Sequence, residues 1–272
     1  MSSRALTLLI IAFGIMSASS SAVHSADELP AGASQLGYRK VLFDVTLRSP
    51  SVSPDRSGTF DFYSGCWWSK VPPALDRYHS DGEVIAISLG GELCTLSKTS
   101  REATIPPLSG SRGFYIEFEA KISSNDPDHW PALWLMPIEH DAALSDHSPG
   151  DPKGFQRWME LDVDEGGFAP GTHGATHSWT GIYPDYKSQR SPSPSSKTFL
   201  DRTSYHKFGA GFDPEALTVR WWIDDRPINS ASYPAVPEVA RNHSYYLIMS
   251  AKSHGQNRPY QLYVRRLRAF GP

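Results

Sequence analysis

The sequence lacks the features that mark several classes of protein. Its 272 residues include only two cysteines, and none of its apolar runs reaches the ~20 residues that a membrane-spanning helix needs. Charge is nearly balanced, with 26 Lys and Arg against 29 Asp and Glu and a formal net charge of −3. These absences argue against a disulfide-dense scaffold, a chain that spans a bilayer and a nucleic-acid binder that works through a basic face.

Turn-forming and aromatic residues are plentiful. The chain has 21 Gly, 22 Pro and eight Trp. No helical period is sustained, and short apolar segments recur between Gly- and Pro-rich turns. In the clearest of them, 114–122 (FYIEFEAKI), apolar and polar residues alternate and so lie on opposite faces of a strand. The pattern predicts an all-β fold, a sandwich of two antiparallel sheets.

The N-terminus has the organisation of a secretory signal peptide. Arg4 supplies the positive charge, 6–16 (LTLLIIAFGIM) is the apolar segment, and small residues lead to a cleavage position at Ala22. We therefore predict a signal peptide at 1–22, an extended lead-in at 23–40 and one β-sandwich domain at 41–272. The protein is expected to be secreted or periplasmic, with no membrane association after cleavage. An N-terminal anchor helix is the alternative.

Export would place Cys66 and Cys94 in an oxidising compartment, where two cysteines are most simply interpreted as one disulfide. The bridge would close a loop of about 28 residues and stabilise the fold by ~3 kcal/mol. The alternative is two buried thiols, because sequence alone does not place the two Cα atoms within bridging range.

The segment 158–167 (WMELDVDEGG) contains four carboxylates within six residues. On a regular strand Leu161 and Val163 would face the core, and the carboxylates before them would face the opposite side. Glu165 would then point inward, where an unpaired charge is costly. A β-bulge near 163–164 would return Glu165 to the carboxylate face.

Carboxylates that share one face suit a specific chemistry. Hydrolysis of a glycosidic bond uses one carboxylate as nucleophile and a second, protonated one as general acid. Glu160, Asp162 and Glu165 would supply both, because crowding raises the pKa of one member of the set. Without the bulge, Asp164 would take the place of Glu165. The same spacing would also fit a solvated acidic edge strand or a calcium site.

The segment resembles the catalytic strand of glycoside hydrolase family 16, the laminarinase and lichenase group, in its bulged form Glu-x-Asp-x-x-Glu. The resemblance covers about residues 80 to 270 and implies a β-jelly-roll of two curved antiparallel sheets with a concave substrate cleft. It also implies retention of anomeric configuration. Further segments match strands of the family in order: 112–122, 129–137 (HWPALWLMP), 175–177, 205–208, 217–225 and 260–267.

Carried over onto this chain, the resemblance implies that Glu160 is the nucleophile and Glu165 the general acid/base, with Asp162 as an assisting carboxylate. Trp134 is expected to be a platform on which a sugar ring stacks. Trp130 faces the same way along the strand and is predicted to bind substrate as well. Packing of either tryptophan in the core is the alternative.

Two further residues are predicted to bind substrate. His177 and Trp179 share one strand face and are expected to reach the cleft, although an exposed hairpin position is the alternative. A zinc site formed by His173 and His177 is rejected, because four strand residues span about 13 Å. Members of the family often bind a structural calcium ion through an Asp in the final strand. In this sequence Gln261 stands at or near that position. We therefore predict no metal and no cofactor.

The sequence thus predicts a secreted, monomeric, endo-acting hydrolase of β-1,3 or mixed β-1,3/1,4-glucan, with a polysaccharide as its partner. One alternative is the same fold acting on a galactan or an acidic exopolysaccharide. A second is a non-catalytic, lectin-like carbohydrate-binding protein, which would have no need of the carboxylates at this spacing. A basic rim for an acidic substrate would consist of four residues on loops that flank the cleft: Lys153, Arg157, Lys187 and Arg190.

Overall fold

The computed structural model describes residues 28–66, 69–97, 102–141, 150–191 and 198–272. The predicted signal peptide and the first part of the lead-in lie outside these residues. In the part of the chain that the structure describes, no helix has the length and apolar character needed to cross a membrane.

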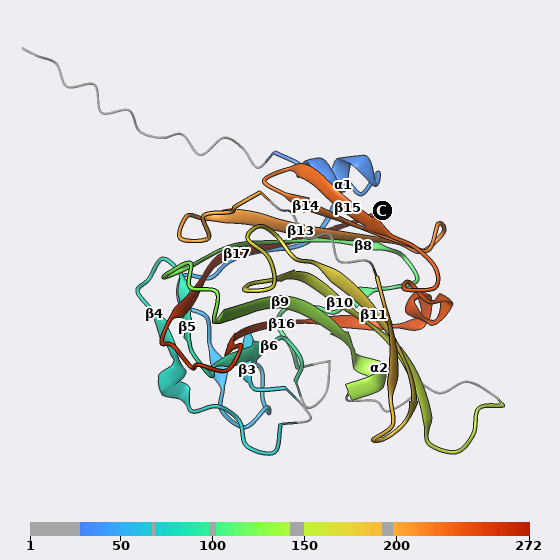
Figure 1. Cartoon of the computed structure of the whole chain (residues 1–272), viewed down its shortest axis with the longest axis horizontal. Helices are drawn as coiled ribbons and strands as arrows, with labels where there is room; N and C mark the ends of the chain where they lie inside the picture. The colour runs from blue at the N-terminus through green and yellow to red at the C-terminus, as the bar shows by residue number, and fades with distance from the viewer. Residues whose placement is uncertain (1–27, 67–68, 98–101, 142–149, 192–197) are drawn as a thin grey trace, which may run out of the picture.

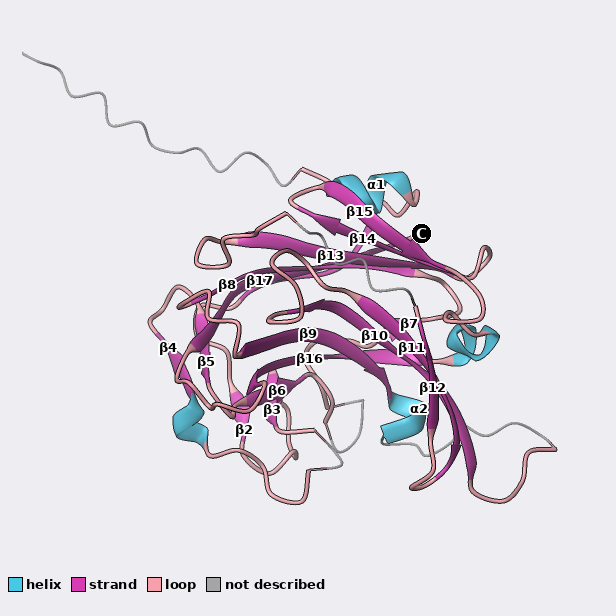
Figure 2. Cartoon of the chain, in the orientation of Figure 1, coloured by secondary structure: helices cyan, strands magenta, loops and turns pink. Residues whose placement is uncertain are grey.

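Two stacked sheets make up the molecule (Figure 1), and helices are few and short (Figure 2). The strands of the first, called the outer sheet, are β1 Lys40–Thr46, β4 Tyr78–Ser80, β5 Ile85–Ser88, β8 Phe114–Ile122, β13 His206–Asp213, β14 Thr218–Ile223, β15 Arg226–Ala231 and β17 Gln261–Gly271. Their order is β15-β14-β13-β8-β17-β5-β4, and β1 also pairs with β17. Every pair in this sheet is antiparallel.

The second sheet, called the cleft sheet, carries the candidate site. Its strands are β2 Val52–Ser53, β3 Phe62–Ser64, β6 Glu92–Cys94, β7 Leu108–Ser109, β9 His129–Pro137, β10 Phe155–Glu165, β11 Ala175–Ile182, β12 Lys187–Arg190 and β16 Ser244–Ser253. Their order is β12-β11-β10-β9-β16-β6-β3-β2, and β7 also pairs with β16. The short helices are α1 Ala31–Gln35, α2 Ile138–Asp141, η1 Leu75–Arg77 and η2 Glu238–Asn242.

The core lies between the two sheets, as the strand pattern predicted. Phe114, Ile116 and Phe118 of β8 are buried in it, together with Leu161 of β10 and Leu247 of β16. These side chains alternate with residues on the opposite face of each strand, so the period of two in the sequence corresponds to the inner faces of a sandwich. The predicted all-β jelly-roll architecture is confirmed.

The predicted extended lead-in is wrong at residues 31–35, which form the one-turn helix α1. The helix lies over the outer sheet, where Ala33 packs with Tyr115 and Trp222 in a small apolar cluster. Gly32 permits this close approach, because a Cβ there would lie 2.3 Å from the Tyr115 ring and 2.8 Å from Trp222. Apolar side chains on the outer face of the sheet thus determine the local structure of this segment.

The predicted disulfide is not present. Cys66 and Cys94 are fully buried thiols that belong to one apolar cluster. The Sγ of Cys94 is directed toward backbone carbonyls, at 3.5 Å from Gly65 O and 3.7 Å from Leu96 O. Each cysteine therefore packs as a small apolar residue.

Candidate active site

Strand β10 contains the bulge that the carboxylate pattern predicted. In its pairing with β9, the register shifts between Asp162 and Asp164, which makes Val163 the extra residue. Val163 stays in the core, and Glu165 returns to the face that carries Glu160 and Asp162. One inserted residue thus places three carboxylates on the same side of the sheet.

A cleft of about 550 Å³ lies on this face of the cleft sheet. The three predicted catalytic carboxylates line it, and so do Trp130 and Trp134. His177 and Trp179 are not part of its lining, although they contact the carboxylates. The full lining is Leu89, Gly90, Glu92, Trp130, Ala132, Trp134, Glu160, Asp162, Glu165, Ser250, Lys252, Ser253 and Asn257.

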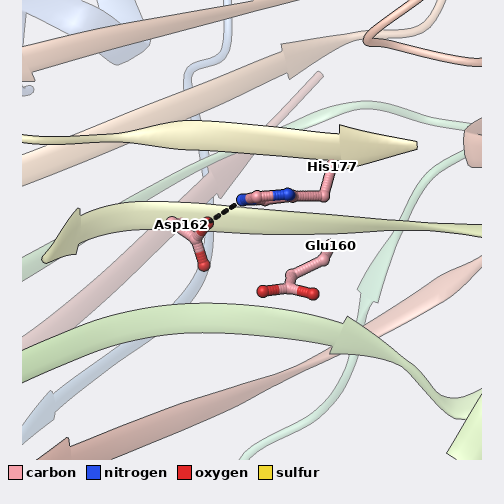
Figure 3. Close-up of side chains that lie close together, drawn as sticks. All are labelled: Glu160, Asp162 and His177. Carbon is pink, nitrogen blue, oxygen red and sulfur yellow. Dashed lines mark ion pairs between the residues drawn. The ribbon is translucent and has the colours of Figure 1, made fainter. Parts of the chain in front are cut away.

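Glu160, Asp162 and His177 form a compact group on β10 and β11 (Figure 3). One oxygen of each carboxylate and one ring nitrogen all lie within 4.8 Å of one another. The Nε2 atom of His177 is 3.4 Å from Oδ2 of Asp162. Such a group could accommodate a divalent cation.

Burial sets the proton affinities in this group. Burial and the charge of Asp162 raise the pKa of Glu160 to about 8. Burial and the charge of Glu165 raise the pKa of Asp162 well above its usual range, and burial lowers the pKa of His177. The carboxyls of Glu160 and Asp162 therefore each hold a proton more tightly than an exposed carboxyl does, and the adjacent imidazole favours its neutral form.

Two of the predicted sugar-binding tryptophans hold the carboxylates by hydrogen bonds. The indole N–H of Trp179 donates to Glu160 Oε2 at 2.7 Å, and that of Trp130 donates to Glu165 Oε1 at 3.0 Å. The Trp130 ring also stacks on His254, with ring centroids 5.1 Å apart. One face of Trp130 is thereby covered, so Trp134 is the better candidate for a stacking platform.

Asp164 does not face the cleft, which rules out its taking the place of Glu165. Its carboxylate is buried and forms an ion pair with Arg202, whose Nη2 donates to Asp164 Oδ1 at 2.9 Å. The backbone N–H of His173 donates to the same oxygen at 3.1 Å. Asp164 therefore has the contacts of a structural residue.

Sequence reasoning missed one charged pair in the cleft. Lys252 Nζ lies 3.1 Å from Oε2 of the buried Glu92, and the Cys66 backbone N–H donates to Glu92 Oε1 at 2.8 Å. The one signal for Lys252 was alternation along β16, since it lies two residues after Ser250 and shares its face. Glu92 gave no comparable signal, because its short strand shows no clear period.

Half of the predicted basic rim is engaged in contacts within the protein. Arg157 pairs with Asp151, and Arg190 Nη2 lies 3.8 Å from Glu165 Oε2. Lys153 and Lys187 are exposed. Several residues of both flanking loops lie outside the described part of the chain. Two cations of the four thus face neighbouring carboxylates.

No family model matches the sequence, and no curated protein matches it. Solved structures do match. The laminarinase from Rhodothermus marinus is similar at 16% identity with a TM-score of 0.51, over 85% of this chain and 97% of that chain. A GH16 protein from Bacteroides ovatus, in complex with a G4G4G3G product, is similar at 15% identity with a TM-score of 0.54, over 84% of this chain and 99% of that chain.

A third similar structure is the κ-carrageenase from Pseudoalteromonas carrageenovora in complex with an oligosaccharide of κ-carrageenan. It is 12% identical with a TM-score of 0.51, over 72% of this chain and 83% of that chain. These matches establish that the chain has the fold of glycoside hydrolase family 16, as the resemblance implied. Their sequence identities are too low to carry more than the fold.

Proposed function

We propose that the protein is an endo-acting glycoside hydrolase that cleaves β-1,3 or mixed β-1,3/1,4-glucan by a retaining double displacement. The observation that carries the proposal is the set Glu160, Asp162 and Glu165 on one face of an open cleft, with raised proton affinities. Binding a sugar chain does not require three neighbouring carboxyls, two buried and one partly buried, with few compensating charges, so a lectin-like role is disfavoured.

In the proposed mechanism each carboxyl takes part in a defined step. Glu160 attacks the anomeric carbon while Glu165 gives its proton to the glycosidic oxygen, and the bond to the leaving sugar breaks. Water then loses a proton to Glu165 and attacks the same carbon, which releases Glu160. Asp162 keeps a proton next to Glu160 while Glu160 acts as the nucleophile. The indole N–H of Trp179 donates to Glu160 Oε2 at 2.7 Å and stabilises Glu160 in its ionised form.

The charge balance of the cleft supports an uncharged polymer. Four carboxyls line it, those of Glu92, Glu160, Asp162 and Glu165, and the single cation of the lining, Lys252, is paired with Glu92. A sulfated or uronate-rich chain would meet repulsion there. The galactan or acidic exopolysaccharide remains the second candidate, because the carrageenase likeness associates this fold with such a substrate.

A polysaccharide panel tests the proposal. The mature protein is incubated with laminarin, lichenan, agar and κ-carrageenan, and the products are sized by chromatography. We expect short oligosaccharides from laminarin or lichenan with the wild type and with Glu83→Gln, an exposed glutamate outside the cleft. Glu160→Gln should give none. Products from agar or carrageenan alone would favour the second candidate, and products from none would contradict hydrolysis.

We also propose that the chain is exported and acts as a monomer, because its polymeric substrate would lie outside the cell and its leader has the signal-peptide pattern. N-terminal sequencing of the protein recovered outside the cytoplasm should begin at Val23. Light scattering should give a mass close to that of one chain. A protein that retains its first residues, or that elutes as a stable dimer, would contradict these two proposals.

A further inference from the structure

Arg190 ends the edge strand β12, opposite His177 of β11. Its Nη2 atom lies 3.8 Å from Glu165 Oε2 and 2.6 Å from Nε2 of His173. The side chain is 39% exposed, whereas that of Glu165 is 9% exposed. A partly solvated guanidinium thus faces the oxygen of Glu165 that the Trp130 N–H does not bind.

Backbone hydrogen bonds hold His173 in a position where its ring can contact Arg190. Its backbone N–H donates to Asp164 at 3.1 Å, and its backbone carbonyl accepts the N–H of Glu165 at 2.7 Å. Burial lowers the pKa of the His173 ring to about 4. The neutral ring can therefore accept a hydrogen bond from Arg190 through Nε2. The bulged end of β10 holds the histidine, and the histidine holds the guanidinium beside Glu165.

The other charged or titratable groups around Glu165 do not replace this cation. Asp162 and Asp164 on its own strand carry carboxyls, and His173 and His177 on the β11 side are neutral near pH 7. From β9, Trp130 contributes an uncharged donor. From β16, Lys252 is paired with Glu92. Among the described residues, Arg190 is the one Lys or Arg within 4.0 Å of Glu165.

We propose that Arg190 is a positioning residue that stabilises the carboxylate form of Glu165 during the proposed reaction. Glu165 becomes this carboxylate when its proton passes to the leaving oxygen, and it stays so until it removes a proton from water. The neighbouring cation favours the proton loss in the first step and keeps the base ready for the second. The proposal rests on the proposed function for the identity of the reaction, and on the distances above for the contact.

A titration of Glu165 tests the contact without any substrate. Glutamate is labelled with ¹³C at the carboxyl carbon, the Glu165 signal is assigned with Glu165→Gln, and its chemical shift is followed against pH by NMR. We expect Arg190→Met to raise the pKa of Glu165 by about one unit, because an opposite charge within ~4–6 Å lowers a carboxyl pKa by one to three units. Arg190→Lys should recover more than half of the shift. Lys187→Met removes a cation from the same strand at an exposed position and should change nothing.

The pH profile of hydrolysis tests the consequence. The alkaline limb of kcat/KM should move up by about one pH unit in Arg190→Met, since Glu165 then keeps its proton to higher pH, and kcat should fall more than KM rises. A Glu165 pKa that is equal in the wild type and in Arg190→Met would overturn the proposal. If the pKa shifts while no polysaccharide is cleaved, the assignment of Arg190 to Glu165 stands and the proposed function fails.

Discussion

Two pairs of carboxylates in this protein, Glu117 with Asp164 and Glu160 with Asp162, differ in their partners. Glu117 of the outer sheet accepts a hydrogen bond from Arg268 Nε at 3.1 Å, and Asp164, at the bulge of the cleft sheet, is paired with Arg202. Glu160 and Asp162, in contrast, have no Lys or Arg within 4.0 Å among the described residues. A carboxylate paired with a buried arginine serves the fold, whereas neighbouring carboxyls without such a partner have raised proton affinities and are suited to acid–base chemistry.

The largest difference between the two pairs of carboxylates is expected when one carboxylate of each is replaced by an amide. We expect Glu160→Gln to lose hydrolysis by at least about 10³-fold, because the proposed mechanism uses Glu160 as its nucleophile. Glu117→Gln should keep the wild-type kcat, since Glu117 lies on the other sheet, while losing stability. The measurement is initial rate on the substrate that the panel identifies, with circular dichroism as a check of folding. Equal loss of activity in two folded variants would break the comparison.

The buried ion pair between Asp164 and Arg202 should contribute to stability and not to catalysis. Arg202→Met leaves Asp164 buried without its cation and should lower the free energy of unfolding by about 3–5 kcal/mol. The double variant Asp164→Asn/Arg202→Met should lose less, because no unpaired charge remains. Urea unfolding measures both. Arg258→Met, which removes an exposed pair with Asp126, is the control and should leave stability nearly unchanged. A small effect of Arg202→Met would contradict the structural role of this pair.

The free energy of unfolding should also depend on pH through the titration of Glu160. The pKa of Glu160 is about 8 in the folded protein against 4.5 for an ordinary glutamate, so between these pH values the folded state binds more protons than the unfolded state. This contribution to stability is complete below pH 4.5 and is lost as pH rises toward 8. Glu160→Gln should therefore be more stable than the wild type by on the order of 1–3 kcal/mol at the alkaline end and nearly equal at the acid end. If the free energies of unfolding of the two proteins depended on pH in the same way, the raised pKa of Glu160 would be contradicted.

The smallest effect is expected from a neutral donor. Trp179→Phe removes the N–H that binds Glu160 but keeps an aromatic ring against Trp158. We expect kcat to fall about fivefold, a loss near 1 kcal/mol, as for one hydrogen bond to a charged group with partial replacement by water. Trp158→Phe is the matched control, because the Trp158 indole N–H has no hydrogen-bond partner among the described residues. A larger loss of kcat in Trp158→Phe than in Trp179→Phe would contradict the role assigned to the Trp179 N–H.

Much of this arrangement could be predicted because it depends on local pattern. Alternation in 114–122 identified the buried face of β8, and the conflict between a core-facing Val163 and a charged Glu165 was enough to predict a bulge. The carboxylate set on the cleft face followed from alternation along 158–165 together with this bulge. All of them are properties of a few consecutive residues, which the period of a strand converts directly into geometry.

The remaining features depend on contacts between distant parts of the chain. Arg202 pairs with Asp164 across 38 residues, and no local pattern singles it out. The hydrogen bonds of Trp130 and Trp179 to carboxylates depend on the register of neighbouring strands, so alternation predicted the face of each indole but not its partner. Helix α1 was missed for the same reason, and the sequence could not decide between a disulfide and two buried thiols, since packing against another element determines each of them.

The configuration of the first product tests most directly whether Glu160 and Glu165 carry out a double displacement. The hydrolysis of the identified β-glucan is followed by ¹H NMR, and the anomeric signals of the new reducing end are recorded before mutarotation. Because two successive inversions restore the starting configuration, we expect the β-anomer to appear first and the α-anomer to grow in later. Initial release of the α-anomer would mean direct displacement by water and would contradict the assignment of Glu160 as nucleophile.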